Sequence, residues 1–314
     1  MSTTEKHRYV MMTVDPVHVG TGGTRLGRVD LSIVREPGTN LPKIPGTSLN
    51  GALRHYAAVR YGKRRCAGQG QSSPNDPGHC GEDACPICYT FGYAKGEGAS
   101  TAHSGVVSIS DARLLLFPVY SMVGPVWVTC PSALTDFGLP NHTVQNDQAK
   151  WAGLTQQRYL SLGWLMVEKD GDDWQIPEGL TTIVADPVKA RIVLLSDKLF
   201  SQVVNANLEV RTSVSINPDT GAAEDKALFT YEAIPRAAYL WLDLIVDDYR
   251  AGFPKVSKAW DCSRDDAGAD LGTPWNGPAD VIAAGLQWME HLGVGGMGTR
   301  GFGRLRKVAE VDYA

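Results

Sequence analysis

Alternation of hydrophobic and polar residues predicts a protein built mainly from β-strands. Residues 9–14 open the pattern, with Val10, Met12 and Val14 on one face of an extended segment. Similar patterning predicts strands over the segments 31–34, 106–118, 126–129, 190–200, 239–246 and 303–308. The strand over 190–200 is expected to lead into a turn. Residues 131–190 have mixed patterning, which assigns no element there.

Two further alternating segments, 208–216 and 226–231, flank the sequence NPDTGAAED. This arrangement predicts a β-hairpin with an exposed tip, and we expect the hairpin unit to cover residues 205–236. Phe229 and Tyr231 lie near its base, where aromatic rings can stack on unpaired bases. The alternative is an ordinary hairpin whose aromatic residues belong to the core.

Two segments have the apolar spacing of helices. The first has a stripe at positions i, i+4 and i+7, formed by Leu49, Leu53 and Tyr56. Thr47 or Ser48 can cap its N-terminus. The second stripe is formed by Ile282, Leu286 and Met289. The order of elements suits an α+β, ferredoxin-like core with large insertions, in a single domain over residues 1–314.

Composition narrows the class of protein. Hydrophobic residues make up 43% of the chain and charged residues 20%, so it can bury a core and is not disordered. The formal net charge of -4 argues against a chain coated with positive charge but permits a local basic groove. No apolar run is long enough to cross a membrane, and the start, MSTTEKHRYV, lacks the apolar part of a signal peptide. We expect a cytoplasmic protein.

Four of the six cysteines lie close together, with a histidine beside the second of them. The candidate metal ligands are Cys66, His79, Cys80, Cys85 and Cys88. Because a cytoplasmic protein forms few disulfides and zinc takes four nitrogen or sulfur ligands, the spacing favours a structural Zn²⁺. The ion would hold together an insertion over residues 62–104 that has no regular structure. Free thiols in a flexible loop are the alternative.

The second helix is followed by GVGGMGTRGFGRL, in which six of thirteen residues are glycine. Glycine loses much conformational freedom on folding, so such a run implies close approach to the backbone. Bare amides can approach a phosphate, and Arg300 and Arg304 add positive charge. A tight helix-to-strand connection is the alternative, although it needs fewer glycines. We expect the closing unit, helix, glycine-rich loop and strand, over residues 279–308.

A second glycine-rich stretch, HVGTGGTRLGRVD, carries His18, Arg25, Arg28 and Asp30. It lacks both the lysine ending of a P-loop and the spacing of a dinucleotide-binding loop, which argues against a nucleotide-binding enzyme. Cleavage of RNA by its own 2′-hydroxyl requires a base or metal to deprotonate the hydroxyl and cations to hold the phosphate, and these residues could supply both. A surface ion pair and a structural histidine are the alternatives.

Together these segments resemble the RAMP superfamily of CRISPR proteins. HVGTGGTRLGRVDLSIVRE and PKIPGTSLNGALR resemble the opening of type III backbone subunits, and the terminal glycine pattern resembles the family's glycine-rich loop. LLLFPVYSMVGPVWVTCP and ALFTYEAIPR resemble the type III-B (Cmr) backbone subunit. The cysteine insertion is more similar to that of the III-A backbone subunit, which leaves the subtype open.

The resemblance implies an RRM-like palm with the hairpin as a thumb. Copies of the chain would line up along CRISPR RNA together with other type III subunits. Each thumb would displace one nucleotide pair of the guide–target duplex, and target RNA would be cut there with Mg²⁺ or Mn²⁺. A non-catalytic guide-binding subunit and a CRISPR RNA processing nuclease are the alternatives.

The resemblance also implies roles for individual residues. Asp30 matches the catalytic aspartate, as base or metal ligand, and His18 matches a histidine of the same loop. Tyr231 and Glu232 match positions near the cleavage point. The residues expected to contact RNA are Arg25, Arg28, Asn50, Arg54, Phe229, Gly293, Gly295, Gly296, Arg300, Gly301, Gly303 and Arg304.

Overall fold

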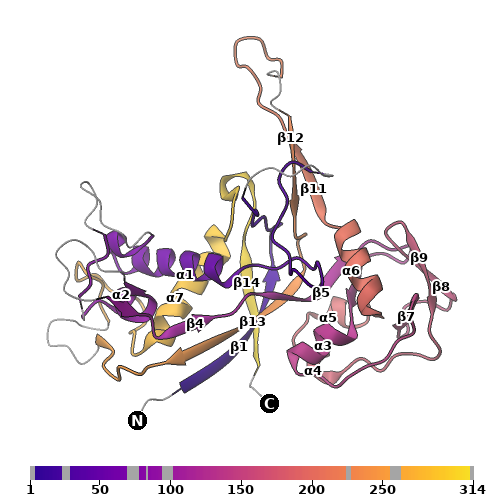
Figure 1. Cartoon of the computed structure of the whole chain (residues 1–314), viewed down its shortest axis with the longest axis horizontal. Helices are drawn as coiled ribbons and strands as arrows, with labels where there is room; N and C mark the ends of the chain where they lie inside the picture. The colour runs from indigo at the N-terminus through magenta and orange to yellow at the C-terminus, as the bar shows by residue number, and fades with distance from the viewer. Residues whose placement is uncertain are drawn as a thin grey trace.

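The structure is a computed structural model that describes residues 4–22, 29–68, 78–82, 84–93, 102–223, 228–254 and 263–311. A ten-stranded, mostly antiparallel sheet runs through the molecule (Figure 1). Along this sheet lie β14 (Leu305–Val311), β1 (Thr4–Thr13), β13 (Tyr239–Asp247), β5 (Arg113–Val119), β6 (Val126–Thr129), β10 (Ile192–Leu195), β7 (Gln148–Trp151), β9 (Leu165–Lys169) and β8 (Tyr159–Leu162), with β4 (Val107–Ile109) also paired to β13. Only β6–β10 and β7–β9 pair in parallel among the described strands. The expected mixture of helices and strands is confirmed.

Helices cover both faces of the sheet. On one face, α1 (Gly46–Arg60) packs against α7 (Pro278–Leu292), and α6 (Asp197–Ala206) contributes to the same core. On the other, α3 (Pro131–Phe137), α4 (Glu178–Thr181) and α5 (Asp186–Lys189) enclose a second core. Neighbouring residues of a strand therefore serve different cores: Met11 belongs to the first and Val10 to the second.

The two longest helices belong to a connected unit at one end of the sheet. In chain order the unit runs β1, α1, β4 and β5, β13, α7 and β14, and its strands lie side by side in the order β14-β1-β13-β5. Strand β1 therefore lies between β13 and β14, the last two strands of the unit. This unit carries the segments that form the candidate site.

The predicted hairpin is confirmed and projects from the body of the molecule (Figure 1). Its strands are β11 (Glu209–Ser213) and β12 (Phe229–Ala233). They pair antiparallel from Glu209 opposite Ala233 to Ser213 opposite Phe229.

The cap predicted for the first helix is wrong. The backbone N–H of Gly46 donates to a carboxylate oxygen of Asp111 at 2.7 Å, and neither Thr47 nor Ser48 makes a capping hydrogen bond. Lys43 holds the other carboxylate oxygen at 2.6 Å. A side chain distant in sequence therefore does the work of a local N-cap, placing the start of α1 against the strands.

Several elements differ from the sequence expectation. Residues 31–35 make isolated bridges, Leu31 to Tyr231 and Ile33 to Gly20, in place of a strand. The turn expected after β10 is the helix α6, whose N-terminus Ser196 caps. The cysteine insertion contains a short helix, α2 (Pro86–Phe91), all of whose residues are buried. It also contains the 3₁₀ turn η1 (Arg64–Cys66) and the strand pair β2 (Gly92–Tyr93) and β3 (His103–Ser104). The insertion therefore shares the main core and is not irregular throughout.

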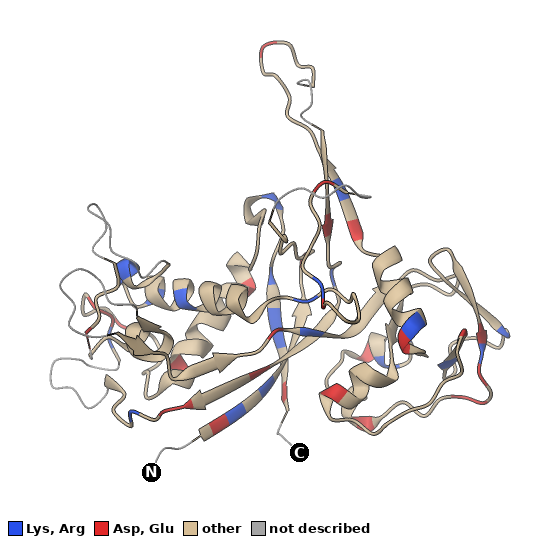
Figure 2. Cartoon of the chain, viewed as in Figure 1, with Lys and Arg blue, Asp and Glu red and all other residues tan. Residues whose placement is uncertain are grey.

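Charged residues of both signs are interspersed along the elements (Figure 2). None of the helices in the described part of the chain has the length and apolar character needed to cross a membrane.

Candidate functional site

Four segments meet at the base of the hairpin: strand β12, residues 29–35, the loop around His18, and the glycine-rich segment 293–303. Side chains alternate along a strand, so Phe229 and Tyr231 share one face of β12 while Thr230 and Glu232 share the other. The aromatic face meets Phe302 of the glycine-rich segment, and the polar face meets residues 30–35. The hairpin base therefore joins two segments distant in sequence.

Asp30 is exposed and fixed to the hairpin by hydrogen bonds. Its Oδ2 accepts from the Thr230 backbone N–H at 2.7 Å and from the Thr230 hydroxyl at 2.9 Å. The Asp30 N–H donates to the same hydroxyl at 3.1 Å. The Thr230 backbone and side chain lower the pKa of Asp30, so the carboxylate is charged at neutral pH.

His18 is buried next to the same strand. Its Nδ1 lies 2.6 Å from the backbone oxygen of Glu232. Because a carbonyl only accepts, Nδ1 carries a proton. The ring also meets the Tyr231 ring edge-on, with centroids 6.1 Å apart.

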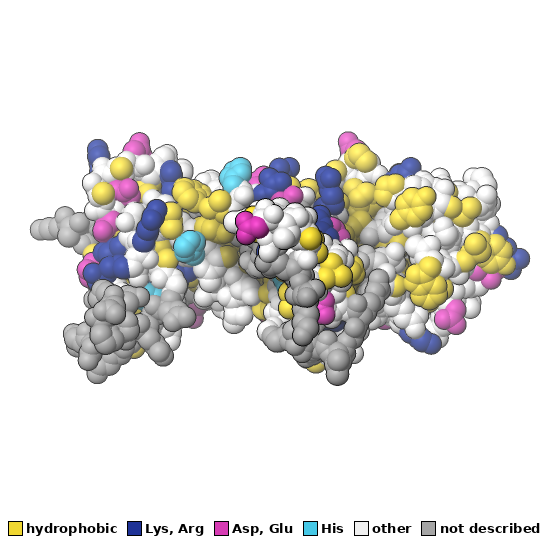
Figure 3. All heavy atoms as spheres, turned by 90° about the horizontal axis from the view of Figure 1, so that it is seen from above, with side chains coloured by type: hydrophobic (Ala, Val, Ile, Leu, Met, Phe, Trp, Pro, Cys, Tyr) yellow, Lys and Arg dark blue, Asp and Glu magenta, His cyan; other side chains and the backbone are white. Residues whose placement is uncertain are grey.

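Tyr231 is buried in an aromatic cluster. Its ring contacts Phe302 and Phe229, with centroids 5.4 and 5.9 Å away, and its hydroxyl accepts a hydrogen bond from Ser213. Arg211 lies over Phe302 and Arg300 over Phe229, at 4.6 and 5.7 Å from the ring centroids. Seen from above, Lys and Arg side chains gather beside the hairpin (Figure 3). Positive charge next to aromatic rings suits an RNA strand.

Glu232 is buried and forms an ion pair. Its carboxylate accepts from Arg35 at 2.7 Å, and Arg35 also donates to the Asn205 side chain at 2.9 Å. The pair therefore ties β12 to residues 33–35 and to α6. Neither Arg35 nor Thr230 was singled out from the sequence, because an arginine or threonine in a strand-like segment is ordinary.

Three of the six glycines in the glycine-rich segment, Gly293, Gly295 and Gly303, are explained by close contacts within the chain. A Cβ on Gly293 would lie 2.6 Å from the backbone of Gly303, and one on Gly303 would lie 2.5 Å from Val294. Both glycines are buried and their backbones pack against each other, while their expected contact with RNA stays a prediction. Gly295, Gly296 and Gly301 are exposed.

Gly295→Ala should misplace His18. Gly295 has φ +86°, and an added Cβ would lie 2.3 Å from the His18 backbone oxygen, so the two segments must move apart. We expect a loss of about 1–3 kcal/mol in stability and a lower thermal unfolding midpoint. Gly301→Ala is the matched control, since it has φ +79° with nothing within 4 Å of the added Cβ. Equal losses from both substitutions would show that close contact with His18 is unimportant.

Other residues expected to bind RNA have varied positions. Arg54 is buried and donates to the backbone oxygens of Cys66 and Gly92, and its expected contact with RNA stays a prediction. Asn50 is half-buried on α1, and Arg304 is exposed and pairs with Asp15. Arg25 and Arg28 lie outside the described residues.

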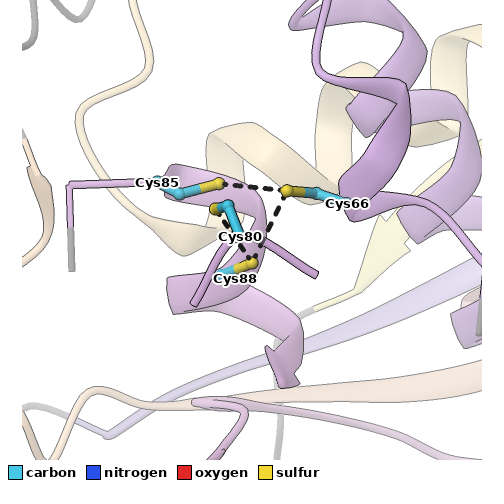
Figure 4. A group of neighbouring side chains, drawn as sticks. All are labelled: Cys66, Cys80, Cys85 and Cys88. Carbon is cyan, nitrogen blue, oxygen red and sulfur yellow. Dashed lines mark hydrogen bonds between the residues drawn. The ribbon is translucent and has the colours of Figure 1, made fainter. Parts of the chain in front are cut away.

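The sulfur atoms of Cys66, Cys80, Cys85 and Cys88 form a compact group, the cysteine cluster (Figure 4). Neighbouring sulfurs are 3.6 to 3.8 Å apart, and all lie within 4.8 Å of one another. Hydrogen bonds from the other three thiols lower the pKa of Cys80. Four cysteines that are this close could hold a metal ion.

His79 is not part of this group. Its Nδ1 lies 3.0 Å from the Arg54 guanidinium, which can only donate, so the imidazole lone pair is already used. Its Nε2 lies 3.2 Å from the Gly68 backbone oxygen. Of the five candidate ligands, the structure therefore brings the four cysteines together.

Comparison with known proteins agrees with this architecture. Over 247 residues, 72% of this chain and 76% of the relative, it is 28% identical to the CRISPR system Cmr endoribonuclease Cmr4 of Pyrococcus furiosus. A 46-residue segment, 15% of this chain and 20% of the relative, is 44% identical to the Cms endoribonuclease Csm3 of Mycobacterium tuberculosis.

Solved structures share the fold. A chain of the type III-B Cmr-beta complex bound to cognate target RNA superposes with a TM-score of 0.65 at 17% identity, covering 96% of both chains. A crystal structure of Cmr4 superposes with a TM-score of 0.57 at 21% identity, covering 97% of this chain and all of the Cmr4 chain. The family model of the RAMP superfamily matches residues 10–306, and the chain therefore belongs to the RAMP superfamily.

Proposed function

We propose that this chain is the backbone subunit of a type III-B CRISPR effector and cuts target RNA paired with a guide. The observation that carries the proposal is the exposed, charged Asp30 held at the base of a projecting hairpin. The resemblance to the family implies that Asp30 matches its catalytic aspartate. The relative named as a Cmr endoribonuclease, aligned over most of both chains, supports the same activity.

The arrangement of strands supports a ferredoxin-like palm with a thumb. The order β14-β1-β13-β5, with α1 and α7 as the two crossover helices, is that of a βαββαβ unit. The hairpin of β11 and β12 leaves this unit as the thumb. Sequence would be read by base pairing with the guide, while the protein recognises backbone shape and phosphates.

Cleavage would use the RNA's own 2′-hydroxyl. Displacing one nucleotide frees the neighbouring 2′-hydroxyl to line up with its phosphate, and Asp30 Oδ1 can accept its proton or bind a cation. Oδ1 accepts no hydrogen bond from the described residues. One free carboxylate oxygen together with RNA phosphates fits the way Mg²⁺ or Mn²⁺ is usually bound, and the ion would stabilise the developing negative charge.

Partners would be CRISPR RNA, target RNA, further copies of the chain and other effector subunits, assembled in the cytoplasm. The far end of the sheet exposes Tyr120, Trp164 and Met166 at 76%, 77% and 63%, and hydrophobic side chains are visible on this end in Figure 3. The backbone N–H of Gly163 donates to the backbone oxygen of Tyr120. This hydrogen bond holds the loop after β5 next to the loop between β8 and β9. Exposed aromatic patches of this kind are typical of protein interfaces.

We also infer that the cysteine cluster binds a structural Zn²⁺. Four sulfurs each about 2.3 Å from a zinc ion, at the corners of a tetrahedron, are about 3.8 Å apart. The observed spacings of 3.6 to 3.8 Å fit this geometry. Four thiolates fill the coordination shell, so the ion would have no position for an activated water.

The test is target cleavage by the assembled complex. We expect cuts at regular intervals that stop with EDTA, and a single 2′-deoxy nucleotide on the 5′ side of one scissile bond should abolish that cut alone. A target that is bound but never cut would favour the structural subunit. Cleavage that survives EDTA would favour a processing-type, metal-independent nuclease.

A further inference from the structure

We propose that Thr230 is a positioning residue that fixes the orientation of the Asp30 carboxylate through its hydroxyl group. This inference rests on the proposed role of Asp30 in cleavage. It concerns a residue of the hairpin, 200 positions away in the chain, that nothing in the sequence pattern singles out.

The hydroxyl of Thr230 makes two hydrogen bonds with the same residue. Its single proton goes to Asp30 Oδ2, and one of its lone pairs accepts the Asp30 backbone N–H. The Thr230 backbone N–H is a third link, also to Oδ2. The two bonds to Oδ2 restrict rotation of the carboxylate, the third holds the Asp30 backbone, and none of the three uses Oδ1.

The backbone beside these bonds fixes their register. The backbone N–H of Leu31 donates to the backbone oxygen of Thr230 at 3.0 Å, and the backbone N–H of Glu232 donates to the backbone oxygen of Leu31 at 3.1 Å. Asp30 and Leu31 thus run parallel to β12. If β12 shifted by one residue relative to Asp30, Phe229 or Tyr231 would lie opposite Asp30. Asp30 would then lose its hydrogen bonds with the Thr230 hydroxyl. Movement of the hairpin is therefore transmitted directly to the carboxylate.

The chain offers a matched control on the same hairpin. Thr212 faces Thr230 across the two strands and is exposed. A Thr→Val change at either position keeps the β-branched shape that suits a strand and removes one hydroxyl. Only at Thr230 does that hydroxyl contact Asp30.

The experiment measures single-turnover cleavage and target binding by complexes assembled with guide RNA. Thr230→Val should slow cleavage by about 10- to 100-fold with target affinity unchanged, because Asp30 is misplaced but still held by the backbone. Thr212→Val should cleave at the wild-type rate. Thr230→Ser should retain cleavage, whereas Thr230→Ala should lose cleavage to the same extent as Thr230→Val. The Ser and Ala variants differ from each other only in the hydroxyl.

Combining Thr230→Val with Asp30→Ala separates this inference from the proposed function. If Thr230 acts through Asp30, the double variant should be no slower than Asp30→Ala alone. Wild-type cleavage by Thr230→Val and Thr230→Ala, or a further loss in the double variant, would overturn the positioning role. Normal cleavage by Asp30→Ala would overturn the proposed function itself.

Discussion

Asp30→Ala should leave the assembled complex bound to its guide and target while slowing target cleavage by about 100- to 10,000-fold. The carboxylate is exposed and, among the described residues, accepts hydrogen bonds only from Thr230, so its removal should change the structure little. The measurement is the rate of single-turnover cleavage at each position of the target, alongside the target dissociation constant.

Two further variants make the result specific. Asp30→Asn keeps the size of the side chain and removes its charge, so it should lose cleavage as Asp30→Ala does. Asp186→Ala removes an exposed aspartate from α5, outside the hairpin base, and should cleave normally. Undiminished cleavage by Asp30→Ala would leave the chain as a guide-binding scaffold with the nuclease elsewhere.

The location of the candidate site could be predicted from the sequence, but its internal contacts could not. Asp30 and Tyr231 were both expected there, since each lies in a recognisable segment. The hydrogen bonds from Thr230 to Asp30 and from Arg35 to Glu232 depend on how β12 pairs with residues 29–35. Spacing along the chain carries no information on that pairing, because the partners are about 200 residues apart.

The same limit applies to Arg54. The resemblance implied that Arg54 and Asn50, which are four residues apart on α1, both contact RNA. The cysteine insertion folds over that part of the helix and takes the guanidinium into the interior. Helical periodicity identifies a face, but it does not say what covers the face.

Strands and helices were predicted where local periodicity was strong. The strands over 126–129 and 239–246 were expected nearly as observed. Residues 131–190 gave no clear pattern because this region consists of short elements that serve different cores: β7 contributes to the first core and α4 to the second. Helix α6 was missed although Ser196 and the apolar residues after it are a recognisable helix start.

Loss of one cysteine from the cluster should be strongly destabilising. Cys66 is buried and within 3.8 Å of both Cys85 and Cys88, so Cys66→Ser would remove a zinc ligand and leave thiolates without a cation. Structural zinc supplies much of the folding energy of the segment it binds, and α2 is part of the main core. We expect a loss of about 4 kcal/mol, or about 6 °C in Tm for a chain of this length.

Metal analysis of the purified protein distinguishes this account from simple core damage. The wild-type chain should carry one zinc per molecule, and Cys66→Ser should carry almost none. Cys130→Ala is the control, because Cys130 is equally buried but stands outside the cluster. It should keep its zinc while losing some stability. Since protons compete with the ion for thiolates, acidification should release zinc from the wild type before the rest of the chain unfolds. A wild-type protein purified without zinc, and no less stable after Cys66→Ser than after Cys130→Ala, would mean that the four thiols only pack together.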